Sequence, residues 1–312
     1  MAAPYPDAGV GTHYGDTSIV EDVTDIIYQI TPEDTPFFSM SGEATSRAIV
    51  HEWQKRSLST RNENSAAEGF TYTFTSAMTL PTRVVNVCQI FKKEIRVSNS
   101  EQAVGHYAIS DSFADQMQLR LVEKKTDIEH TLLNGTIASG TATDESRYME
   151  GFLKAVQDAS TTYTTYSGAV TLSESNFNDA IQVSWEQGGE PRDVLVHGGL
   201  KREISAFSAN NTKFIAADQQ RQVNTISMYE SDFFPVQIHL SRDMRSNASA
   251  NTTGNAIAFV DRTMVRKAWL RRPFAKRIPE TADSMDGVCV AELTLEWGNE
   301  LAHHFIDNVR RI

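Results

Sequence analysis

The chain of 312 residues is 40% hydrophobic and 22% charged, so it can bury a sizeable core, and its formal net charge is −11. No stretch approaches the about 18 consecutive apolar residues of a membrane span, and the first Lys or Arg is Arg47, so a basic secretory-signal start is missing. Two cysteines, Cys88 and Cys289, make neither a disulfide framework nor a Cys-x-x-Cys zinc site. A membrane protein, a disulfide-stapled miniprotein and a zinc ribbon are excluded, which leaves a soluble protein of a reducing cytoplasm.

The first segment, residues 1–46, is predicted to be an arm. It contains eight Asp or Glu and no Lys or Arg, and four prolines interrupt regular structure. Apolar residues at helical spacing predict a short amphipathic helix at about residues 18–30. Asp34–Met40 follows as an extended apolar anchor.

Residues 47–97 are predicted to form a long β-hairpin. The outgoing strand starts near Ala48–Gln54, and the returning strand includes Val85–Phe91 and Glu94–Val97. Ser57–Pro81 between them is rich in Ser, Thr, Asn, Ala and Gly. Each side of about 20 residues would reach roughly 65 Å. A compact domain rarely needs such a hairpin, so it is either a disordered insertion or it lies on something outside its own subunit.

A long helix is predicted next. Ser98–Glu101 fits a capping box at its start, Asn134-Gly135 fits a helix end, and apolar residues form one stripe between them. An unbroken helix of about 34 residues would span about 50 Å. Gly105 and Ser110–Ser112 are the places where it could bend or split.

Residues 150–285 are predicted to form an α/β domain. A helix around Phe177 ends at Gly188-Gly189, and Asp193–His197 is a short buried strand followed by a second helix. Phe234–Leu240 and Ala256–Val260 are further strands. After the domain, a strand at 289–297 places Cys289 and alternate apolar residues on one face and Glu292, Thr294 and Glu296 on the other.

Motifs for catalysis and cofactor binding are missing from the sequence. There is no phosphate-binding loop, no dinucleotide fingerprint, no His-Glu-x-x-His and no nucleophile elbow. His303-His304 with Asp307 invites a metal interpretation, but neighbouring residues on a strand point to opposite faces, which disfavours it. Gly198-Gly199 is best read as a tight turn rather than an anion site. We therefore expect no catalytic residue, cofactor or metal.

A basic strip lies at Arg262–Arg277, with seven Lys or Arg and no acid. Trp269 and Phe274 interleave with its cations, as in single-strand nucleic-acid binders, but a net charge of −11 opposes strong phosphate-driven binding. The strip either meets the acidic arm, in particular between copies of the chain, or it is a solvated face. Only weak, non-specific contact with DNA is expected.

The order of these predicted segments resembles the major capsid protein of tailed bacteriophages, with the Hong Kong 97-type fold. The order is an arm, a long hairpin, a long helix, an α/β domain and a late strand that returns to the helix-bearing part. The resemblance covers nearly the whole chain. The local segments that carry it are Asp34–Met40, His51–Gln54, Gln89–Lys92, Val97-Ser98, Asp127–Glu129, Leu132-Leu133, Arg271–Pro273, Glu292–Glu296 and Asn299-Glu300.

The resemblance implies an α+β fold in four parts. These are an N-terminal arm (1–46), an extended hairpin loop lying on the neighbouring subunit (47–97), a peripheral domain with the long spine helix (98–149 and 286–312) and an α/β axial domain (150–285). It also implies a non-enzymatic coat subunit of the virion, made in the host bacterial cytoplasm, that assembles into hexamers and pentamers as an icosahedral shell around double-stranded DNA. A portal, and a separate scaffold or a decoration protein, would be its partners.

Three alternatives stay open at this point: the shell of an encapsulin-like nanocompartment, a soluble α/β enzyme, and a small structural or adaptor protein of the virion. Packaged DNA would separate the coat from the nanocompartment, and size-exclusion chromatography would reveal a small-oligomer enzyme. Because only 46 residues precede the hairpin, we expect no fused scaffolding segment. Particles that form readily from this chain alone would count against a separate scaffold.

Subunit contacts are hypothesised for arm acids, apolar residues of the arm and hairpin, and the basic strip. The apolar residues would pack against their own core or a neighbour, and the arm acids would pair with the strip of an adjacent copy. The residues are Asp22, Asp25, Phe37, Phe38, Trp53, Arg61, Tyr72, Phe74, Arg266, Arg271 and Arg272.

The shell is predicted not to be covalently cross-linked. Some members of the resembled family join subunits through a loop lysine and an asparagine next door, but Ser57–Arg83 contains Arg61 and Arg83 and no Lys. A denaturing gel of purified particles should show a single monomer band. A ladder of covalent oligomers would contradict this prediction.

Overall fold

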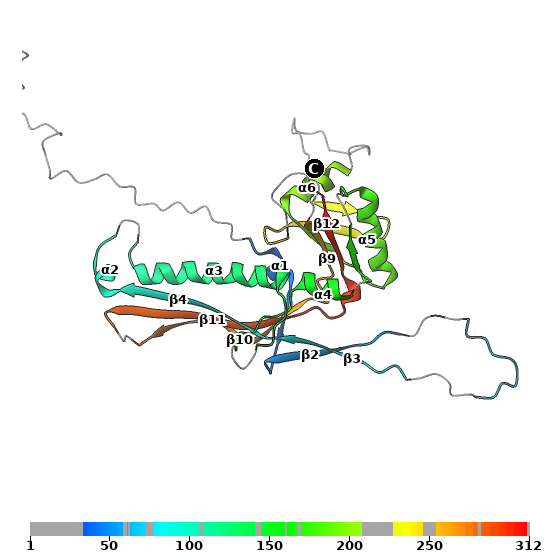
Figure 1. Cartoon of the computed structure of the whole chain (residues 1–312), viewed down its shortest axis with the longest axis horizontal. Helices are drawn as coiled ribbons and strands as arrows, with labels where there is room; N and C mark the ends of the chain where they lie inside the picture. The colour runs from blue at the N-terminus through cyan, green and yellow to red at the C-terminus, as the bar shows by residue number, and fades with distance from the viewer. Residues whose placement is uncertain are drawn as a thin grey trace, which may run out of the picture.

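The computed structural model places a long helix along a hairpin-shaped sheet, an α/β domain at one end and a projecting two-stranded ribbon (Figure 1). It describes residues 34–58, 61, 63–72, 78–106, 109–140, 145–159, 161–166, 170–207, 227–245, 254–279 and 282–310. The mixture of helices and strands is the α+β fold class that the sequence predicts.

The first sheet has four strands in the order β1-β10-β11-β4. Antiparallel β10 and β11 form its long central hairpin, β4 pairs antiparallel with β11, and the short β1 runs parallel to the start of β10. The bounds are β1 (Gly42–Thr45), β4 (Gln89–Ser98), β10 (Arg266–Ile278) and β11 (Ser284–Glu296).

The predicted long helix is split into α2 (Asn99–Ala103) and α3 (Ser112–Asn134), as its internal Gly and Ser residues suggested. Each part has its own cap: the Ser98 hydroxyl accepts the Glu101 amide at 3.1 Å, and the Asp111 carboxylate accepts the Ala114 amide at 3.0 Å. Helix α3 ends at Gly135 and lies along β4 and β11 (Figure 1).

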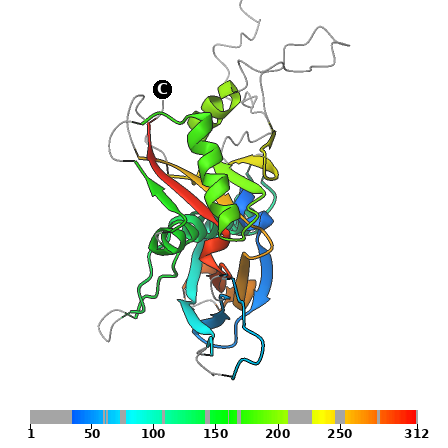
Figure 2. The same ribbon diagram turned by 90° about the vertical axis from the view of Figure 1, so that its right-hand side faces the viewer.

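The second sheet has six strands in the order β5-β12-β9-β6-β8-β7. Figure 2 shows α5 lying across this sheet, and Phe177 and Ile181 of α5 are fully buried against it. The elements are α4 (Phe152–Ala159), β5 (Tyr163–Thr165), α5 (Glu174–Glu186), β6 (Asp193–Val196), α6 (Gly198–Ala206), β7 (Met228–Glu230), β8 (Pro235–Leu240), β9 (Asn255–Val260) and β12 (His304–Val309).

Sheet membership corrects the expected segment boundaries. Strand β10, which falls within 150–285, belongs to the four-stranded sheet, and β12, which falls within 286–312, belongs to the six-stranded sheet. The chain thus crosses out of the α/β domain between β9 and β10 and returns to it between β11 and β12. Apolar alternation identifies a strand but does not say which sheet it joins, so the sequence could not place either crossing.

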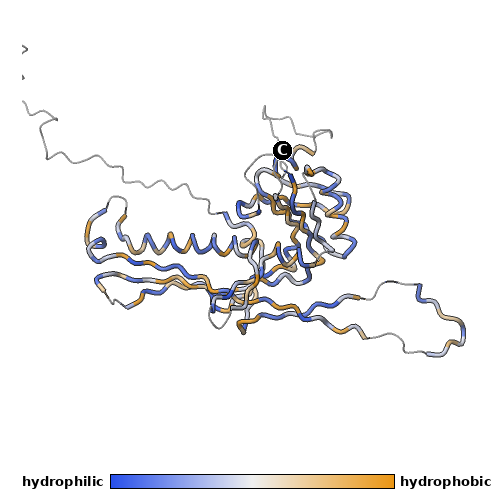
Figure 3. The backbone as a smooth tube through the Cα atoms, viewed as in Figure 1, coloured by the Kyte–Doolittle hydropathy of each residue, from blue (hydrophilic) through white to orange (hydrophobic). Residues whose placement is uncertain are grey.

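One buried cluster joins the two sheets. It includes Phe37 before β1, Leu132 of α3, Phe152 of α4, Trp297 after β11 and Phe305 of β12. The rings of Phe37 and Phe152 lie 5.3 Å apart. Figure 3 shows apolar residues concentrated where these elements meet, and also scattered along the projecting ribbon. The short η3 (Glu300–Ala302) completes the return from β11 to β12.

Gly151 lies where two backbone segments touch, and its replacement by Ala should destabilise the subunit by about 2–3 kcal/mol. A Cβ atom there would lie 2.4 Å from the Gly135 amide nitrogen and 2.8 Å from the Leu133 carbonyl oxygen, and backbone cannot rotate away. The matched control is Gly105→Ala, where nothing lies within 4 Å of the added Cβ. Thermal unfolding should show a lower midpoint for Gly151→Ala only; equal midpoints would contradict the close approach.

Candidate assembly surfaces

The base of the projecting ribbon is fixed to its own subunit. Strands β2 (Val50–Lys55) and β3 (Thr82–Val87) pair antiparallel from Val50↔Val87 to Lys55↔Thr82. The Trp53 ring stands edge-on to Trp297 at 4.8 Å, and its Nε1–H donates to the Gly298 carbonyl at 2.8 Å. An ion pair of Lys55 with Glu300 and a contact of the His51 ring with the Glu296 carboxylate at 3.2 Å flank the Trp53–Trp297 contact. The direction of the ribbon is therefore set within the subunit.

The described part of the loop beyond this base is exposed to solvent. Every described residue from Arg56 to Pro81 is exposed. Five of them are large and apolar, with exposed fractions of 94% for Leu58, 76% for Tyr72 and Met78, 66% for Leu80 and 54% for Phe70. Leaving such side chains in water forfeits roughly 1.5–3 kcal/mol each relative to full burial. A loop with this surface is suited to contact another molecule (Figure 3).

Two buried charges anchor the arm where it joins the body. In helix α1 (Pro36–Met40), the amides of Phe37 and Phe38 donate to the Glu129 carboxylate at 2.9 and 2.6 Å. At the other end of the helix, the Lys267 ammonium donates to the carbonyls of Phe38 and Ser41 at 2.8 and 2.9 Å. A cation at the C-terminus matches the helix dipole, and a carboxylate at the N-terminus matches it where Glu129 is ionised. The arm therefore enters the body at a fixed point between α3 and β10.

Burial raises the pKa of Glu129 to about 7, although the amides of Phe37 and Phe38 oppose this shift. Burial also favours the neutral form of Lys267, and therefore lowers its pKa. Because the folded subunit holds a proton on Glu129 that the unfolded chain releases above pH 4.5, the stabilising contribution of the protonated group is lost as the pH rises through 7.

Glu129→Gln should therefore remove part of the pH dependence of stability. From pH 5 to pH 8 the free energy of unfolding of the wild type should fall by on the order of 2–3 kcal/mol more than that of Glu129→Gln. Denaturant unfolding of both proteins at several pH values measures this difference, in which the titration of all other groups cancels. Parallel stability curves would contradict the raised pKa.

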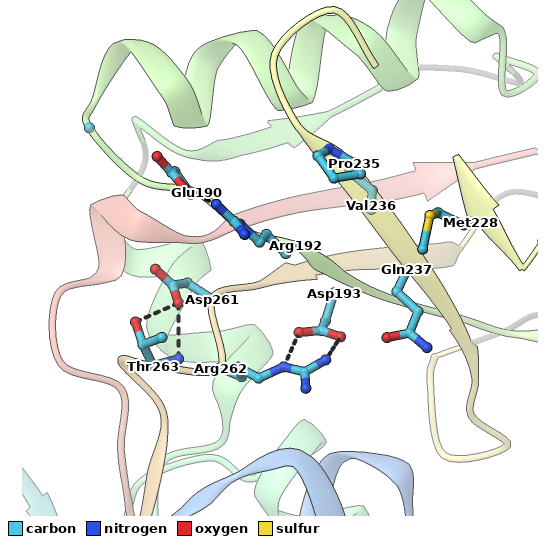
Figure 4. A pocket seen from close by; sticks show the side chains of 11 residues that line it. Glu190, Arg192, Asp193, Met228, Pro235, Val236, Gln237, Asp261, Arg262 and Thr263 are labelled. Carbon is cyan, nitrogen blue, oxygen red and sulfur yellow. Dashed lines mark hydrogen bonds and ion pairs between the residues drawn. The ribbon is translucent and has the colours of Figure 1, made fainter. Parts of the chain in front are cut away.

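An open cavity of about 650 Å³ lies at one end of the six-stranded sheet (Figure 4). Its buried carboxylate, Asp193, is held by Arg262 at 2.6 Å and by His239 at 2.9 Å. Burial alone would raise the pKa of Asp193, but these hydrogen bonds outweigh it and hold the pKa below its usual range. The Asp193 carboxylate is thus occupied by structural partners, and the Thr263 hydroxyl in the cavity lining donates to the Asp261 carboxylate at 2.7 Å.

The two adjacent histidines of the sequence occupy separate environments. His303 accepts the Asp261 amide at 3.1 Å and contacts the Trp297 carbonyl at 3.0 Å, whereas His304 contacts the Thr164 hydroxyl at 3.1 Å. Burial lowers both pKa values to about 4. Over the described ranges, no three His, Cys, Asp or Glu gather in a way that could hold a metal ion, and no helix there is long and apolar enough to span a membrane.

Comparison with known proteins decides the family. The family model described as "SU10 major capsid protein" matches residues 8–310, nearly the whole chain. The chain belongs to the SU10 major capsid protein family. A curated relative, the major capsid protein of Escherichia phage Phieco32, is 28% identical over 116 residues, which are 37% of this chain and only 33% of that relative.

Solved capsids share the fold of this SU10-family chain. The capsid of cyanophage A-1(L) superposes with a TM-score of 0.67 at 12% identity, covering 96% of this chain and 100% of that one. The capsid of Myoviridae phage XM1 gives 0.62 at 10% identity, covering 94% and 100%. The SrpI encapsulin of Synechococcus elongatus gives 0.63 at 10% identity, covering 93% of each chain. The Hong Kong 97-type fold is confirmed.

The residues hypothesised to make subunit contacts lie in different environments in this SU10-family structure. Asp22, Asp25 and Phe74 lie outside the described residues. Arg61 and Tyr72 are exposed on the projecting loop.

Three of the hypothesised apolar residues pack within their own subunit. Phe37 is a correction to the list: it is 0% exposed inside its own subunit, so it has no surface to offer a neighbour. Phe38 is half-buried against Trp269, and Trp53 is half-buried against Trp297.

The basic strip of this SU10-family chain is partly engaged within the subunit. Arg271 contacts the buried Glu292 carboxylate at 2.7 Å, together with Arg147 at 2.8 Å. Arg272 lies 3.3 Å from Glu43, and Arg266 is exposed. Sequence reasoning missed Glu129 and Lys267, the charges that hold α1. A signal existed for Glu129, since it stands among the apolar residues of the α3 stripe.

Proposed function

We propose that this chain is the coat subunit of a tailed-phage head, with a structural and non-enzymatic role. Copies would assemble into hexamers and pentamers that close into an icosahedral shell around double-stranded DNA. Membership in the SU10 major capsid protein family supports this proposal. The observation that carries it is the loop at 56–81, whose described large apolar side chains are each more than half exposed.

In the proposed shell, the loop of each copy lies on a neighbour. The α3–β4–β11 part would form the periphery of the capsomer and the six-stranded domain its axial centre. Weak contacts repeated over a closed shell add up, so no single contact has to be strong. A portal, and a separate scaffold or a decoration protein, would complete the head, and the subunit would be synthesised in the host bacterial cytoplasm.

The second candidate is the shell of a nanocompartment, which the structural similarity to the SrpI encapsulin favours. Matched electron micrographs and nucleic-acid assays of native particles separate the two functions. We expect closed shells that contain nuclease-protected double-stranded DNA. Shells that enclose a protein cargo and no genome would support the nanocompartment, and small oligomers would contradict both.

A further inference from the structure

The far end of β10 is an exposed cationic strand. Its partner β1 stops at the pair Thr45↔Trp269, and past that point the described residues provide no second neighbour for β10. All residues of Arg271–Ile278 are exposed. This stretch carries four Lys or Arg and no acid.

The surface of this stretch is apolar as well as basic. Phe274 is 42% exposed and Ile278 is 39% exposed, and Lys276 stands between them on the same side of the strand. Arg277 points to the other side, where its guanidinium lies 5.9 Å from the Phe113 ring centroid. A partner that fits this surface must bring apolar groups and negative charges at short intervals.

The chain itself contains such a segment in the part of the arm that precedes Asp34. Residues 1–33 hold six Asp or Glu and no Lys or Arg, and residues 19–30 interleave six Ile or Val with Glu21, Asp22 and Asp25. Thirty-three residues can reach up to about 110 Å when extended, so an arm can reach beyond its own subunit.

The place where the arm leaves the body favours a neighbour over its own strip. Asp34 lies 3.9 Å from Arg242 of the α/β domain, whereas β10 runs away from that domain toward the distant hairpin tip (Figure 1). The same edge of β10 already pairs with β1, the strand at the end of the arm, over the four pairs Gly42↔Arg266 to Thr45↔Trp269. The arm of another copy would lie along the same edge of β10, beyond the point where β1 ends.

We infer that the acidic stretch 19–30 of one copy docks on the exposed end of β10, Arg271–Ile278, of an adjacent copy. The inference rests on the proposed assembly and centres the arm contact on Phe274–Ile278 rather than on Arg266–Arg272, because Arg271 already pairs with Glu292 and Lys267 is buried within the subunit. Apolar arm residues cover Phe274 and Ile278, and arm carboxylates face Lys276 and its basic neighbours.

Carbodiimide cross-linking of intact particles tests this contact, because it joins only carboxylates and amines that touch. Lys276 is the only lysine of Arg271–Ile278, and residues 2–33 contain carboxylates but no lysine. Particles are assembled from equal amounts of ¹⁵N-labelled and unlabelled chains. Mass spectrometry should find arm peptides joined to the Lys276 peptide, with mixed-isotope pairs among them. Same-isotope pairs alone would show docking within one chain and overturn the inference.

Three variants and one rival outcome complete the test. Lys276→Arg keeps the charge and should abolish the link while particles stay intact, and exposed Lys92 on β4 should acquire no arm link. Lys276→Glu should lower the salt concentration at which particles dissociate, and adding Asp22→Lys with Asp25→Lys should restore it in part.

If Lys276 is shielded from acetylation only in DNA-filled particles, nucleic acid covers the strip and the inference fails. Absence of wild-type particles would instead reject the proposed function.

Discussion

Replacing residues 56–81 by an Asn-Gly turn that connects Lys55 to Thr82 should leave the subunit folded and abolish its assembly into particles. These two residues are paired neighbours in the β2–β3 ribbon, so a two-residue turn can close it without changing its register. The 26 residues removed, 56–81, are exposed wherever the structure describes them, so their loss should remove little folding energy. Size-exclusion chromatography with light scattering should show a folded small species with wild-type circular dichroism, and micrographs should show no shells.

Point variants make the same test without shortening the chain. Leu58→Asp and Tyr72→Asp each place a charge where a neighbour should cover an apolar side chain, and each should reduce the particle yield at least tenfold. Asn64→Asp, at an exposed polar position of the same loop, is the matched control and should assemble normally. Shells from the shortened chain, or equal yields from all three variants, would contradict a loop held by a neighbouring copy.

Phe37→Ala should destabilise the subunit by about 3–5 kcal/mol, the usual cost of emptying a buried aromatic site. Phe37 is 0% exposed and packs against Phe152 and the surrounding cluster, so the loss leaves a cavity at the junction of the two sheets. Denaturant unfolding of the shortened, non-assembling chain measures this cost without interference from subunit contacts.

The control for Phe37→Ala is Phe274→Ala in the same background. Phe274 is 42% exposed on β10, so its truncation should change the free energy of unfolding by less than about 1 kcal/mol. An equally small effect of Phe37→Ala would mean that the side chain serves subunit contacts rather than the core.

Local signals in the sequence identified most elements of the fold. The side chains of Ser98 and Asp111 cap two helices, and Gly135 ends the second, because these residue types satisfy backbone groups at helix ends whatever the tertiary structure. The polar stretch 57–81 indicated a segment without intrachain support, and the described part of it is uncovered. Such features depend on neighbours in sequence, which a single chain displays directly.

Features that depend on long-range partners were not predictable. The alternation at 289–297 suggested a polar face for Glu292 and Thr294, but both are buried, and Glu292 is neutralised by Arg147 and Arg271 from distant segments. The role of Phe37 was likewise open, since an apolar residue type does not reveal whether its own core or another copy covers it. For the same reason, the sequence did not reveal that β10 joins the four-stranded sheet and β12 the six-stranded sheet.

A cryo-electron microscopy reconstruction of the native assembly tests the central claim most directly, because it shows what covers the side chains of Leu58, Tyr72 and Leu80. We predict a closed shell in which the loop of each copy rests on the body of the adjacent copy. A lone subunit, or a shell in which each loop folds back over its own subunit, would contradict the account.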